Sequence, residues 1–533
     1  MKFLERNQIL QTSLLRVLGG SFAIHKDLVI LALGVTWSAL SANAETRHLS
    51  RDELRDRIQG GWAGQMIGVS FGAPTEFRAM GRINEAELKW SPDRVSNAIG
   101  QDDLYVEMTF AKVMDDVDLE ATCEQFGDAF CVSKYGLWHA NAGARRALNQ
   151  GIKAPWSGHP KYNFHANDID FQIEADFIGL MCPGLPREVV KYCDRVGRVM
   201  NYGDGLYGGM FVGGMYSAAY FEPDPRKVVE AGLACIPAKS QYGLLIRDLL
   251  AWSAEHPNDW RAVWQLLEQK WDKDDPCPDG ALEAFNIDAK LNGAYLASGL
   301  LFGGGDFYKT MEIATRCGQD SDCNPSSAAG VLGVILGYNR IPDQFKCGIP
   351  ALADTKFEFT DYSFNSIAKS TETRALKVIQ MAGGKVTESE VIVPIQKPKA
   401  PKLEQWTPGI PDRKIDVKDS AWSWRGDWKE NREGRSTESS GSEFALKFRG
   451  VAVALVGDLS QSGGKADVYL DGRKAGVADA YIVENTHDNV LWNVYGLKPG
   501  EHTIRLVITG DADPRSKGTK VSLKKAVVYR AAN

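Results

Sequence analysis

The sequence contains no Cys-x-x-Cys pair, although it has nine cysteines among 533 residues. Zinc ribbons and thioredoxin-like redox sites are commonly built on such pairs, so the cysteine spacing supports neither class of site. Cysteine is also too sparse for a small scaffold held together by disulfides. The odd number leaves at least one thiol unpaired within the chain.

The chain also lacks a long basic tract and a long apolar run. Its formal net charge is −6, with 62 Lys and Arg against 68 Asp and Glu, which gives no sign of nucleic-acid binding. Beyond the N-terminal region the apolar runs are short and rich in Gly and Ala, so we expect no membrane span in the mature chain. The composition, 44% hydrophobic and 24% charged, is that of a globular protein, and the length predicts more than one domain.

An export signal is predicted at the N-terminus. Residues 28–40 form an apolar run of signal-peptide length that is too short to span a bilayer. Ala42-Asn43-Ala44 then gives a small-residue cleavage pattern. We therefore predict a signal peptide over residues 1–44 and a periplasmic or secreted protein. A short N-terminal membrane anchor is the alternative interpretation of the same run.

Asp320 and Asp322 are placed two residues apart in a short loop between two predicted helices. Asn324 fits the N-cap of the second helix, Pro325 fits its first helical position, and Gly337 fits its end. Buried negative charge needs a counter-charge, and a hard divalent cation is the simplest one. The loop therefore predicts a metal site.

A second acidic pair, Asp102-Asp103, opens another helix-like run. Two acidic pairs at helix entrances predict one shared metal site formed by Asp102, Asp103, Asp320 and Asp322. Aspartate is also a common N-cap and favours the positive end of the helix dipole, so helix capping alone is the alternative for either pair.

The first helix of the mature chain is predicted to start after Ser50. This residue fits the N-cap, and Glu53 three residues later fits a capping box. Apolar residues then recur every four positions, which indicates one buried face. Four glycines between residues 60 and 68 cost helix propensity, so they indicate the close approach of another helix or of a ligand.

From about residue 50 to residue 338 the chain resembles the ADP-ribosylglycohydrolase family. The resemblance rests on three motifs in the family's order and approximate spacing. These are a Gly-rich turn with Pro74 and Glu76, then Gln101-Asp102-Asp103, then Asp320-Ser321-Asp322-Cys323. The family's hydroxyl-bearing ligand, a Thr or Ser, is replaced in both metal motifs, by Gln101 and by Cys323.

This resemblance implies an all-α helical bundle, which we assign to residues 45–355. It also implies that one or two Mg²⁺ ions bind in a central cleft, and that Glu76 is a catalytic or metal-bridging glutamate. The implied metal ligands are Asp102, Asp103, Asp320 and Asp322.

The stretch 162–180 departs from the family pattern. ADP-ribosyl hydrolases are expected to have a Gly-Asn-Gly run and Met-Arg here, whereas this chain presents Asp170, Glu174 and Asp176. Acidic residues repel a diphosphate, but they accept hydrogen bonds from sugar hydroxyls and transfer protons. We therefore expect Asp170 and Glu174, which are four residues apart, to join Glu76 as catalytic candidates. A solvated helix face is the alternative.

Further polar residues are expected to line the substrate cleft. The Gly-rich turn 202–209 contributes two of them, but it lacks Lys-Ser/Thr and a preceding strand, so a phosphate-binding loop is rejected. His139 is interpreted as a packed or surface histidine rather than a base. The predicted cleft residues are Gln101, His165, Asn167, Asp168, Asp204, Tyr207 and Cys323.

The sequence pattern changes after residue 355. Residues 356–402 are predicted to be a connector that ends in a Pro/Lys linker. Residues 403–533 show strand periodicity, with Phe444, Leu446 and Phe448 alternating with polar residues and Asp471-Gly472 at a hairpin turn. This region resembles the galactose-binding-like β-sandwiches of many secreted carbohydrate enzymes.

Three tryptophans, Trp422, Trp424 and Trp428, stand close together at the start of this region. Exposed tryptophans can stack on sugar rings, whereas buried ones form core contacts. We expect packing in the core or between domains, because tryptophan is mostly buried in folded proteins.

The sequence thus predicts a multidomain protein with an all-α helical bundle followed by an all-β sandwich. The predicted function is an exported, Mg²⁺-dependent glycoside hydrolase acting on a carbohydrate, with a furanoside as one candidate. An ADP-ribosyl hydrolase, a non-catalytic carbohydrate-binding relative and a purely structural descendant are the alternatives. Retention of all four metal aspartates argues against the last two.

Overall fold

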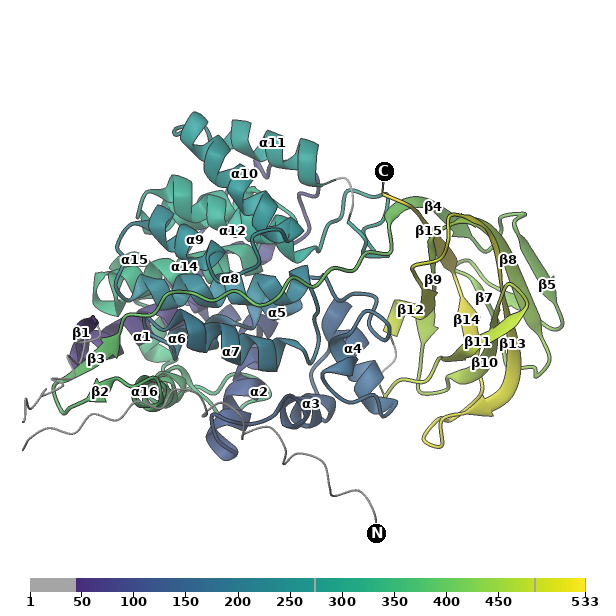
Figure 1. Ribbon diagram of the computed structural model, residues 1–533, viewed down its shortest axis with the longest axis horizontal. Coiled ribbons are helices and arrows are strands. Elements are labelled where there is room, and N and C mark those ends of the chain that lie inside the picture. Colours follow the sequence, from purple (N-terminus) through teal and green to yellow (C-terminus); the bar gives the residue numbers. More distant parts are fainter. Residues whose placement is uncertain (1–44, 273–274, 484–485, 533) are drawn as a thin grey trace, which may run out of the picture. The chain divides into compact units, whose positions relative to one another are not determined.

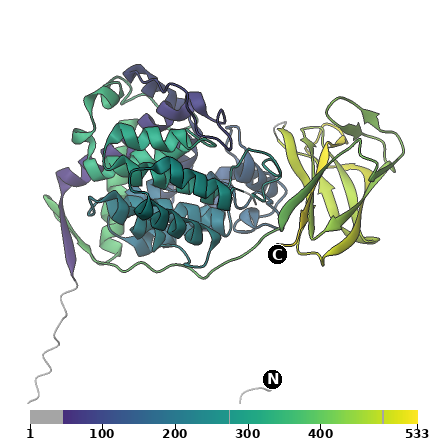
Figure 2. The same ribbon diagram turned by 90° about the horizontal axis from the view of Figure 1, so that it is seen from above.

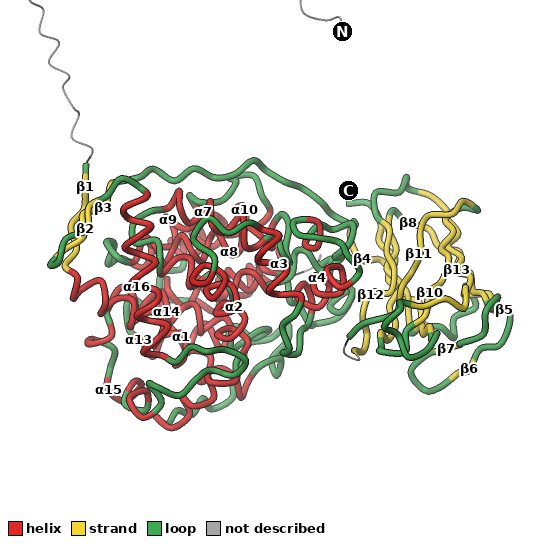
Figure 3. The backbone as a smooth tube through the Cα atoms, turned by 90° about the horizontal axis from the view of Figure 1, so that it is seen from below, coloured by secondary structure: helices red, strands yellow, loops and turns green. Residues whose placement is uncertain are grey.

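The computed structural model describes residues 45–272, 275–483 and 486–532 (Figure 1). The predicted signal peptide, residues 1–44, lies outside the described residues. After one short strand at residues 46–50, helices come first and most strands follow, as predicted (Figure 3). In the part of the chain that is described, no helix is long and apolar enough to cross a membrane.

The helical part is built around α1 and α14, which pack against each other. The helices α13 and α16 also pack against α1, and α8 and α12 pack against α14. The helices are α1 (Arg51–Gly72), α2 (Asp102–Asp116), α3 (Cys123–Cys131), α4 (His139–Asn149), α5 (Asp170–Ile173), α6 (Asp176–Leu180), α7 (Pro186–Gly197), α8 (Asp204–Ala219), α9 (Pro225–Leu233), α10 (Gln241–Glu255), α11 (Trp260–Trp271), α12 (Ala289–Gly303), α13 (Phe307–Arg316), α14 (Cys323–Leu336), α15 (Asp343–Lys346) and α16 (Phe364–Met381).

The glycines of α1 face the backbone of α14, which confirms the predicted close approach. A Cβ on Gly64 would lie 2.2 Å from a backbone carbonyl oxygen of α14, so no side chain fits there. The contacts step by four residues in opposite directions along the two helices, as expected for an antiparallel pair. They join Gly60 to Gly333, Gly64 to Ala329, Gly68 to Pro325 and Gly72 to Ser321.

The start of α1 is tied to a distant part of the chain. Ser50 is the N-cap, as predicted, and its Oγ accepts a hydrogen bond from the Glu53 backbone N–H at 3.1 Å. The Glu53 side chain pairs with Arg57 instead of returning to the N-cap, so only half of the capping box forms. The preceding strand β1 (Thr46–Ser50) pairs antiparallel with β3 (Glu390–Pro394).

The start of α14 differs from the prediction, but its end does not. The predicted N-cap at Asn324 and first helical position at Pro325 are wrong, because α14 begins at Cys323 with Asp322 as the N-cap. The Asn324 side-chain amide instead donates to Asn292 Oδ1 at 3.0 Å. Gly337 ends the helix with φ of +75°, a conformation that glycine adopts without strain.

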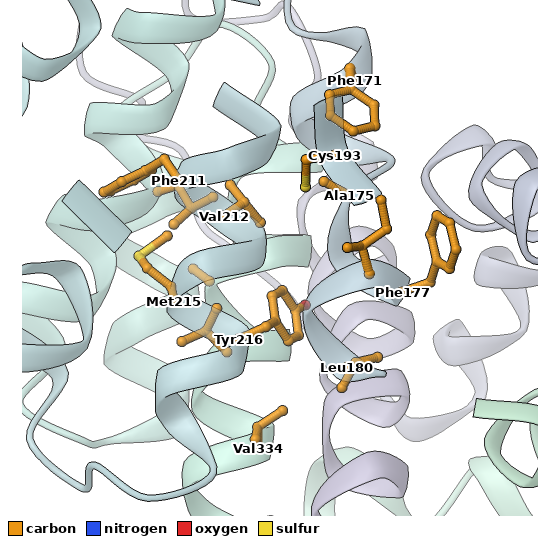
Figure 4. Packing of buried hydrophobic residues seen from close by; sticks show 14 of the residues in the cluster. Phe171, Ala175, Phe177, Leu180, Cys193, Phe211, Val212, Met215, Tyr216 and Val334 are labelled. Atoms are coloured by element: carbon orange, nitrogen blue, oxygen red, sulfur yellow. The ribbon is translucent and has the colours of Figure 1, made fainter. Parts of the chain in front are cut away.

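The hydrophobic core continues beside α8 (Figure 4). Phe171 of α5, Phe177 of α6 and Phe211 of α8 are fully buried there. Tyr216 of α8 points its hydroxyl toward α6, so a polar group enters an otherwise apolar layer. The core thus surrounds the short helices α5 and α6, which belong to the acidic stretch 162–180.

The predicted connector contains ordered elements that pack on the helical part. α16 and the strands β2 (Lys385–Val386) and β3 follow one another, and α16 packs against α1. The chain then runs as an extended segment along the helices (Figure 2). Tyr207 of α8 holds this segment, because its hydroxyl donates to the Lys402 carbonyl at 3.2 Å and accepts from the Glu404 N–H at 2.7 Å.

The C-terminal region is a pair of antiparallel sheets with a shared core, in the orders β11-β10-β13-β8-β5 and β12-β9-β15-β4, with β14-β7-β6 alongside. The predicted alternation is confirmed, since Phe444, Leu446 and Phe448 of β8 are all buried. The strands are β4 (Ile410–Asp416), β5 (Trp422–Arg425), β6 (Lys429–Glu430), β7 (Arg435–Thr437), β8 (Glu443–Gly450), β9 (Ala452–Leu459), β10 (Gly464–Leu470), β11 (Arg473–Asp479), β12 (Thr486–Val494), β13 (Gly500–Ala512), β14 (Val521–Leu523) and β15 (Lys525–Arg530).

Two local predictions in this region are also confirmed. Asp471 and Gly472 form the two-residue turn between β10 and β11, and both have positive φ, as a type I′ hairpin turn requires. Trp422 is 6% exposed, and its ring lies edge-on to Phe444. Trp422 is therefore a core residue and not a sugar-stacking platform.

Replacing Gly64 by alanine tests the contact between α1 and α14. The added Cβ clashes with the Ala329 carbonyl, so we expect Gly64→Ala to lower the free energy of unfolding by about 1–3 kcal/mol. The loss should appear although alanine is intrinsically the better helix former by roughly 0.5–1 kcal/mol. The denaturant midpoint of the helical circular-dichroism signal measures it.

Gly476→Ala in β11 is the matched control. A Cβ there would have its nearest neighbour, Nε1 of Trp492, at 3.6 Å, which is ordinary contact. We expect its effect to stay within about 0.5 kcal/mol. An unchanged midpoint for Gly64→Ala would show that α1 and α14 separate slightly without cost.

Candidate active site

The carboxylates predicted from the metal motifs lie together where α1, α2 and α14 meet. Glu76 follows η1 (Ala73–Thr75) at the end of α1, Asp102 and Asp103 begin α2, and Asp320 and Asp322 precede α14. One carboxylate oxygen from each of Glu76, Asp320 and Asp322 lies within 4.8 Å of the other two. This spacing allows one cation to contact all three groups.

A second group of donor atoms shares Asp322 with the first. Atoms of Asp103, Asp322 and Cys323 also lie within 4.8 Å of one another. The Cys323 Sγ lies 3.3 Å from Asp103 Oδ2 and 3.8 Å from Asp322 Oδ1. The thiol thus stands in a ligand position, and Asp322 lies where it can bridge two ions.

The positive charges that act on this group, Arg78 and His139, lower the pKa of Glu76 less than burial and the neighbouring aspartates raise it. Across residues 45–272, 275–483 and 486–532, Lys and Arg form no ion pair with any of the five carboxylates. Burial, followed by the charge of Asp322, raises the pKa of Asp102 to about 6 and raises that of Asp103 well above its usual range. Desolvation, followed by the charges of Asp322 and Asp102, raises the pKa of Glu76 to about 7.

The donor atoms fit a hard divalent cation. Asp103 Oδ1 and Asp320 Oδ1 are buried and have no hydrogen-bond partner among the described residues. An unpaired buried oxygen is costly, and a cation that takes oxygen ligands would remove that cost. The site therefore has the number, type and spacing of oxygen donors that such an ion needs.

A deeper pair of acids, Glu107 and Asp176, lies behind the site and was not predicted as part of it. Both are at most 1% exposed. Asp176 Oδ2 accepts hydrogen bonds from Gln65 Nε2 at 2.6 Å and from the Tyr216 hydroxyl at 2.7 Å, and Glu107 Oε2 accepts from the Phe177 N–H at 2.8 Å. The sequence feature that could have identified Glu107 is its position four residues after Asp103, on the same helix face.

Asp170, predicted as catalytic, holds the start of α4. Its two oxygens accept hydrogen bonds from the backbone N–H groups of Ala140 at 3.0 Å and Asn141 at 3.1 Å. Its side chain is buried, so the alternative of a solvated helix face is excluded. These bonds place Asp170 where it fixes the geometry of the start of α4.

Glu174, also predicted as catalytic, has a different environment. It is 1% exposed and follows α5, where the predicted single helix is interrupted. Asn141 Nδ2 donates to its Oε1, while Oε2 is buried without a hydrogen-bond partner in the described part of the chain. Burial, followed by the charge of Asp170, raises the pKa of Glu174 well above its usual range.

The predicted cleft residues of the polar stretch lie on the far side of Asp170. His165 Nδ1 lies 2.8 Å from Asp168 Oδ2, and both residues are buried. Asn167 Oδ1 accepts a hydrogen bond from Trp406 Nε1 at 3.0 Å. His139, interpreted as a packed or surface residue, begins α4. One of its ring nitrogens lies within 4.8 Å of a ring nitrogen of His165.

The other predicted cleft residues have partners outside the acidic group. Asp204 Oδ1 accepts from the Tyr242 N–H at 3.2 Å, and Tyr207 binds the extended segment before the sheets. The Gln101 side chain donates to Asn97 Oδ1 at 2.8 Å and makes no capping bond to α2. Asp204, Tyr207 and Gln101 therefore make structural contacts around the site.

A family model described as ADP-ribosylglycohydrolase matches residues 50–372, which is more than half of the 533 residues. The match includes α1, α2 and α14 and every residue of the acidic group.

Two curated proteins of Flavonifractor plautii also match parts of the chain. One is "A type blood alpha-D-galactosamine galactosaminidase", 36% identical over 101 residues, which covers 18% of this chain and 9% of that protein. The other is "A type blood N-acetyl-alpha-D-galactosamine deacetylase", 30% identical over 139 residues, covering 25% and 17%. The chain therefore spans less than a fifth of the length of either relative.

Solved structures match with low similarity. An "ADP-ribosylglycohydrolase-related protein complex" matches with a TM-score of 0.39 and 16% identity over 62% of this chain and 99% of that chain. A family two carbohydrate esterase from Cellvibrio japonicus matches with a TM-score of 0.18 and 15% identity over 22% of this chain and 32% of that chain.

Cation binding should stabilise the protein through the acidic group. We expect Mg²⁺ or Mn²⁺ at about 100 times its dissociation constant to add about 2.7 kcal/mol to the free energy of unfolding. Asp322→Asn should remove most of this gain, because Asp322 belongs to both groups of donors. The same variant should be no less stable without the ion, since it relieves like-charge repulsion.

Thermal unfolding with and without the ion measures both effects. Asp116→Asn, at the exposed end of α2, is the matched control and should keep the full ion-dependent gain. An Asp322→Asn protein that is still stabilised as strongly as the wild type would contradict this assignment.

Proposed function

The chain belongs to the ADP-ribosylglycohydrolase family, and from this premise we propose that it is an exported glycoside hydrolase that requires Mg²⁺ or a similar divalent cation. The observation that carries the proposal is the group of acidic side chains centred on Asp322, whose buried oxygens lack any cationic partner among the described residues. The predicted signal peptide supports export.

The surroundings of the site support a carbohydrate rather than ADP-ribose as the substrate. Asp170 and Glu174 are buried acids in the stretch where ADP-ribosyl hydrolases are expected to hold their ligand. They offer a diphosphate no positive charge, whereas Glu174 Oε2, which has no hydrogen-bond partner among the described residues, is available to a sugar hydroxyl. The names of the two Flavonifractor plautii relatives refer to amino sugars, which also supports a carbohydrate substrate.

In the proposed mechanism, Asp102, Asp103, Asp320 and Asp322 hold one or two ions. When bound, the ion supplies positive charge and coordination positions for the hydroxyls of a sugar diol. Glu76 stands at the exposed edge of the group, where it can reach the bond to be cleaved and transfer a proton.

ADP-ribosyl hydrolysis is the second candidate function, and the family match favours it. A panel of substrates separates the two candidates. It should contain oligosaccharides, aryl furanosides, aryl pyranosides and an ADP-ribosyl peptide, each with Mg²⁺ and with a chelator.

We expect the purified mature protein to release sugar from a glycoside and to stop when the chelator is added. Release of ADP-ribose alone would replace the proposal with the second candidate. Failure to release anything in the presence of Mg²⁺ would favour a non-catalytic binding protein, with Gln101 and Cys323 as replaced ligands.

Asp322→Ala tests the role of the acidic group in turnover. Loss of a residue shared by both groups of donors should lower kcat/KM by about 10²-fold or more, because a catalytic metal contributes several kcal/mol to transition-state stabilisation. Asp116→Asn again serves as the control. Full turnover by Asp322→Ala would refute the metal mechanism.

Replacing the two buried acids, Asp170 and Glu174, one at a time should affect stability and turnover differently. Asp170→Ala removes two backbone hydrogen bonds at the start of α4, so we expect a loss of about 1–3 kcal/mol in stability together with reduced activity. Glu174→Gln keeps an acceptor for Asn141, so stability should change little. If Glu174 transfers a proton, kcat should fall by about 10²–10⁴-fold.

Unfolding midpoints and kcat, measured on the same preparations, give both readouts. Full kcat in Glu174→Gln would leave Glu76 as the remaining candidate for proton transfer.

A further inference from the structure

A separate cluster of four side chains, all of types that coordinate metal ions, lies beside the acidic site. His139 comes from the start of α4, His165 from the loop before α5, and Cys277 and Asp279 from the loop between α11 and α12. One donor atom from each of the four lies within 4.8 Å of the other three. Three separate segments therefore bring two imidazoles, a thiol and a carboxylate to one point.

The spacing of these atoms fits a tetrahedral ion. Ligands bound at about 2.0–2.3 Å in a tetrahedron lie roughly 3.3–3.8 Å apart. The Cys277 Sγ lies 3.5 Å from His165 Nδ1, and His139 Nδ1 lies 3.4 Å from Asp279 Oδ2. The remaining pairs of donor atoms lie within 4.8 Å.

The chemical types of the four donor atoms indicate which metal ion would bind. Imidazole and thiolate are ligands of zinc, whereas Mg²⁺ prefers oxygen donors and keeps several waters. Four protein ligands also fill a tetrahedral zinc site completely, as in structural zinc sites. This group therefore differs in chemistry from the acidic group around Asp322, which offers mainly carboxylate oxygens.

Two further observations single out His139. Its Nδ1 is buried and makes no hydrogen bond within the described residues, although Asp279 lies nearby. Its backbone has φ of +43°, a conformation that is unfavourable for a residue with a side chain. The ring stacks against Phe285, with 5.8 Å between ring centroids, so it is held with an unsatisfied nitrogen toward the other three ligands.

We propose that His139, His165, Cys277 and Asp279 bind a Zn²⁺ ion. Asp168 Oδ2, which lies 2.8 Å from His165 Nδ1, accepts the histidine N–H when no ion is bound. Binding then releases one proton to solvent, from the Cys277 thiol, while the His165 ring moves its proton from Nδ1 to Nε2.

The ion would fix the loop that carries Cys277 against α4. This loop also meets the C-terminal sheets, because the Tyr529 hydroxyl of β15 donates to the Pro276 carbonyl at 2.8 Å. Asp170 binds the same end of α4 and lies next to Glu174 in the sequence stretch of the active site. Zinc would therefore fix the positions of this loop and of the start of α4, between the acidic site and the sheets.

The metal content of the full mature protein tests the proposal. After removal of all metals, we expect the protein to take up one Zn²⁺ per chain in competition with a chromogenic chelator, even in a large excess of Mg²⁺. Replacing zinc by Co²⁺ should produce a thiolate-to-cobalt charge-transfer band. No zinc uptake, or uptake that Mg²⁺ abolishes, would overturn the proposal.

Two cysteine variants locate the ion. Cys277→Ser should lose the charge-transfer band and weaken zinc binding at least tenfold, whereas Cys323→Ser, in the acidic site, should keep both. The opposite result would place the ion in the acidic site and overturn the proposal. Cys347→Ser, at an exposed thiol, controls for handling of a cysteine variant.

His165→Ala removes a second ligand and should weaken zinc binding in the same way, which covers the case in which Cys277→Ser does not fold. None of these measurements depends on hydrolysis. A protein without glycosidase activity could still bind zinc, and an active one could fail to do so.

Discussion

The close contact between α1 and α14 is the constraint on which the active site depends. Helices with ordinary side chains at their interface lie about 8–10 Å apart. The glycine face of α1 removes those side chains, so the backbones touch and the register is fixed from Gly60 to Gly72. Glu76 follows one helix and Asp322 precedes the other, so this register decides whether their oxygens lie within reach of one ion.

The polar groups of the core fall into two kinds. Asp176 receives hydrogen bonds from Gln65, Tyr216 and a serine of α14, so its oxygens have partners, although burial still raises its pKa to about 7. Asp103 and Asp320, a short distance away, each keep a buried oxygen with no partner among the described residues. Because the fold can satisfy a buried carboxylate where it needs to, the unsatisfied ones mark where a ligand is expected.

Much of this arrangement could be read from local patterns. The N-cap at Ser50, the glycine face of α1, the hairpin at Asp471 and the two acidic pairs each depend on neighbours within a few residues. The N-cap of α14 was misplaced because Asn324 bonds to another helix, which no local pattern shows.

The functional groups that sequence reasoning missed are formed by distant segments. Glu107 and Asp176 meet only because α2 and α6 pack together, and the zinc ligands lie up to 140 residues apart in the chain, from His139 to Asp279. Spacing rules such as Cys-x-x-Cys detect sites carried by a single turn, so they give no signal for a site assembled in this way. The role of Asp170 at α4 is hidden for the same reason.

The pairing of β1 with β3 bears on how the protein is made. Strand β1 finds its partner only at Glu390–Pro394, and α1, which follows directly, is covered by α14 from Cys323 onward. Neither early element can bury its surface until these late segments have been synthesised. Contacts so distant in sequence close slowly, because the intervening chain must first lose its freedom.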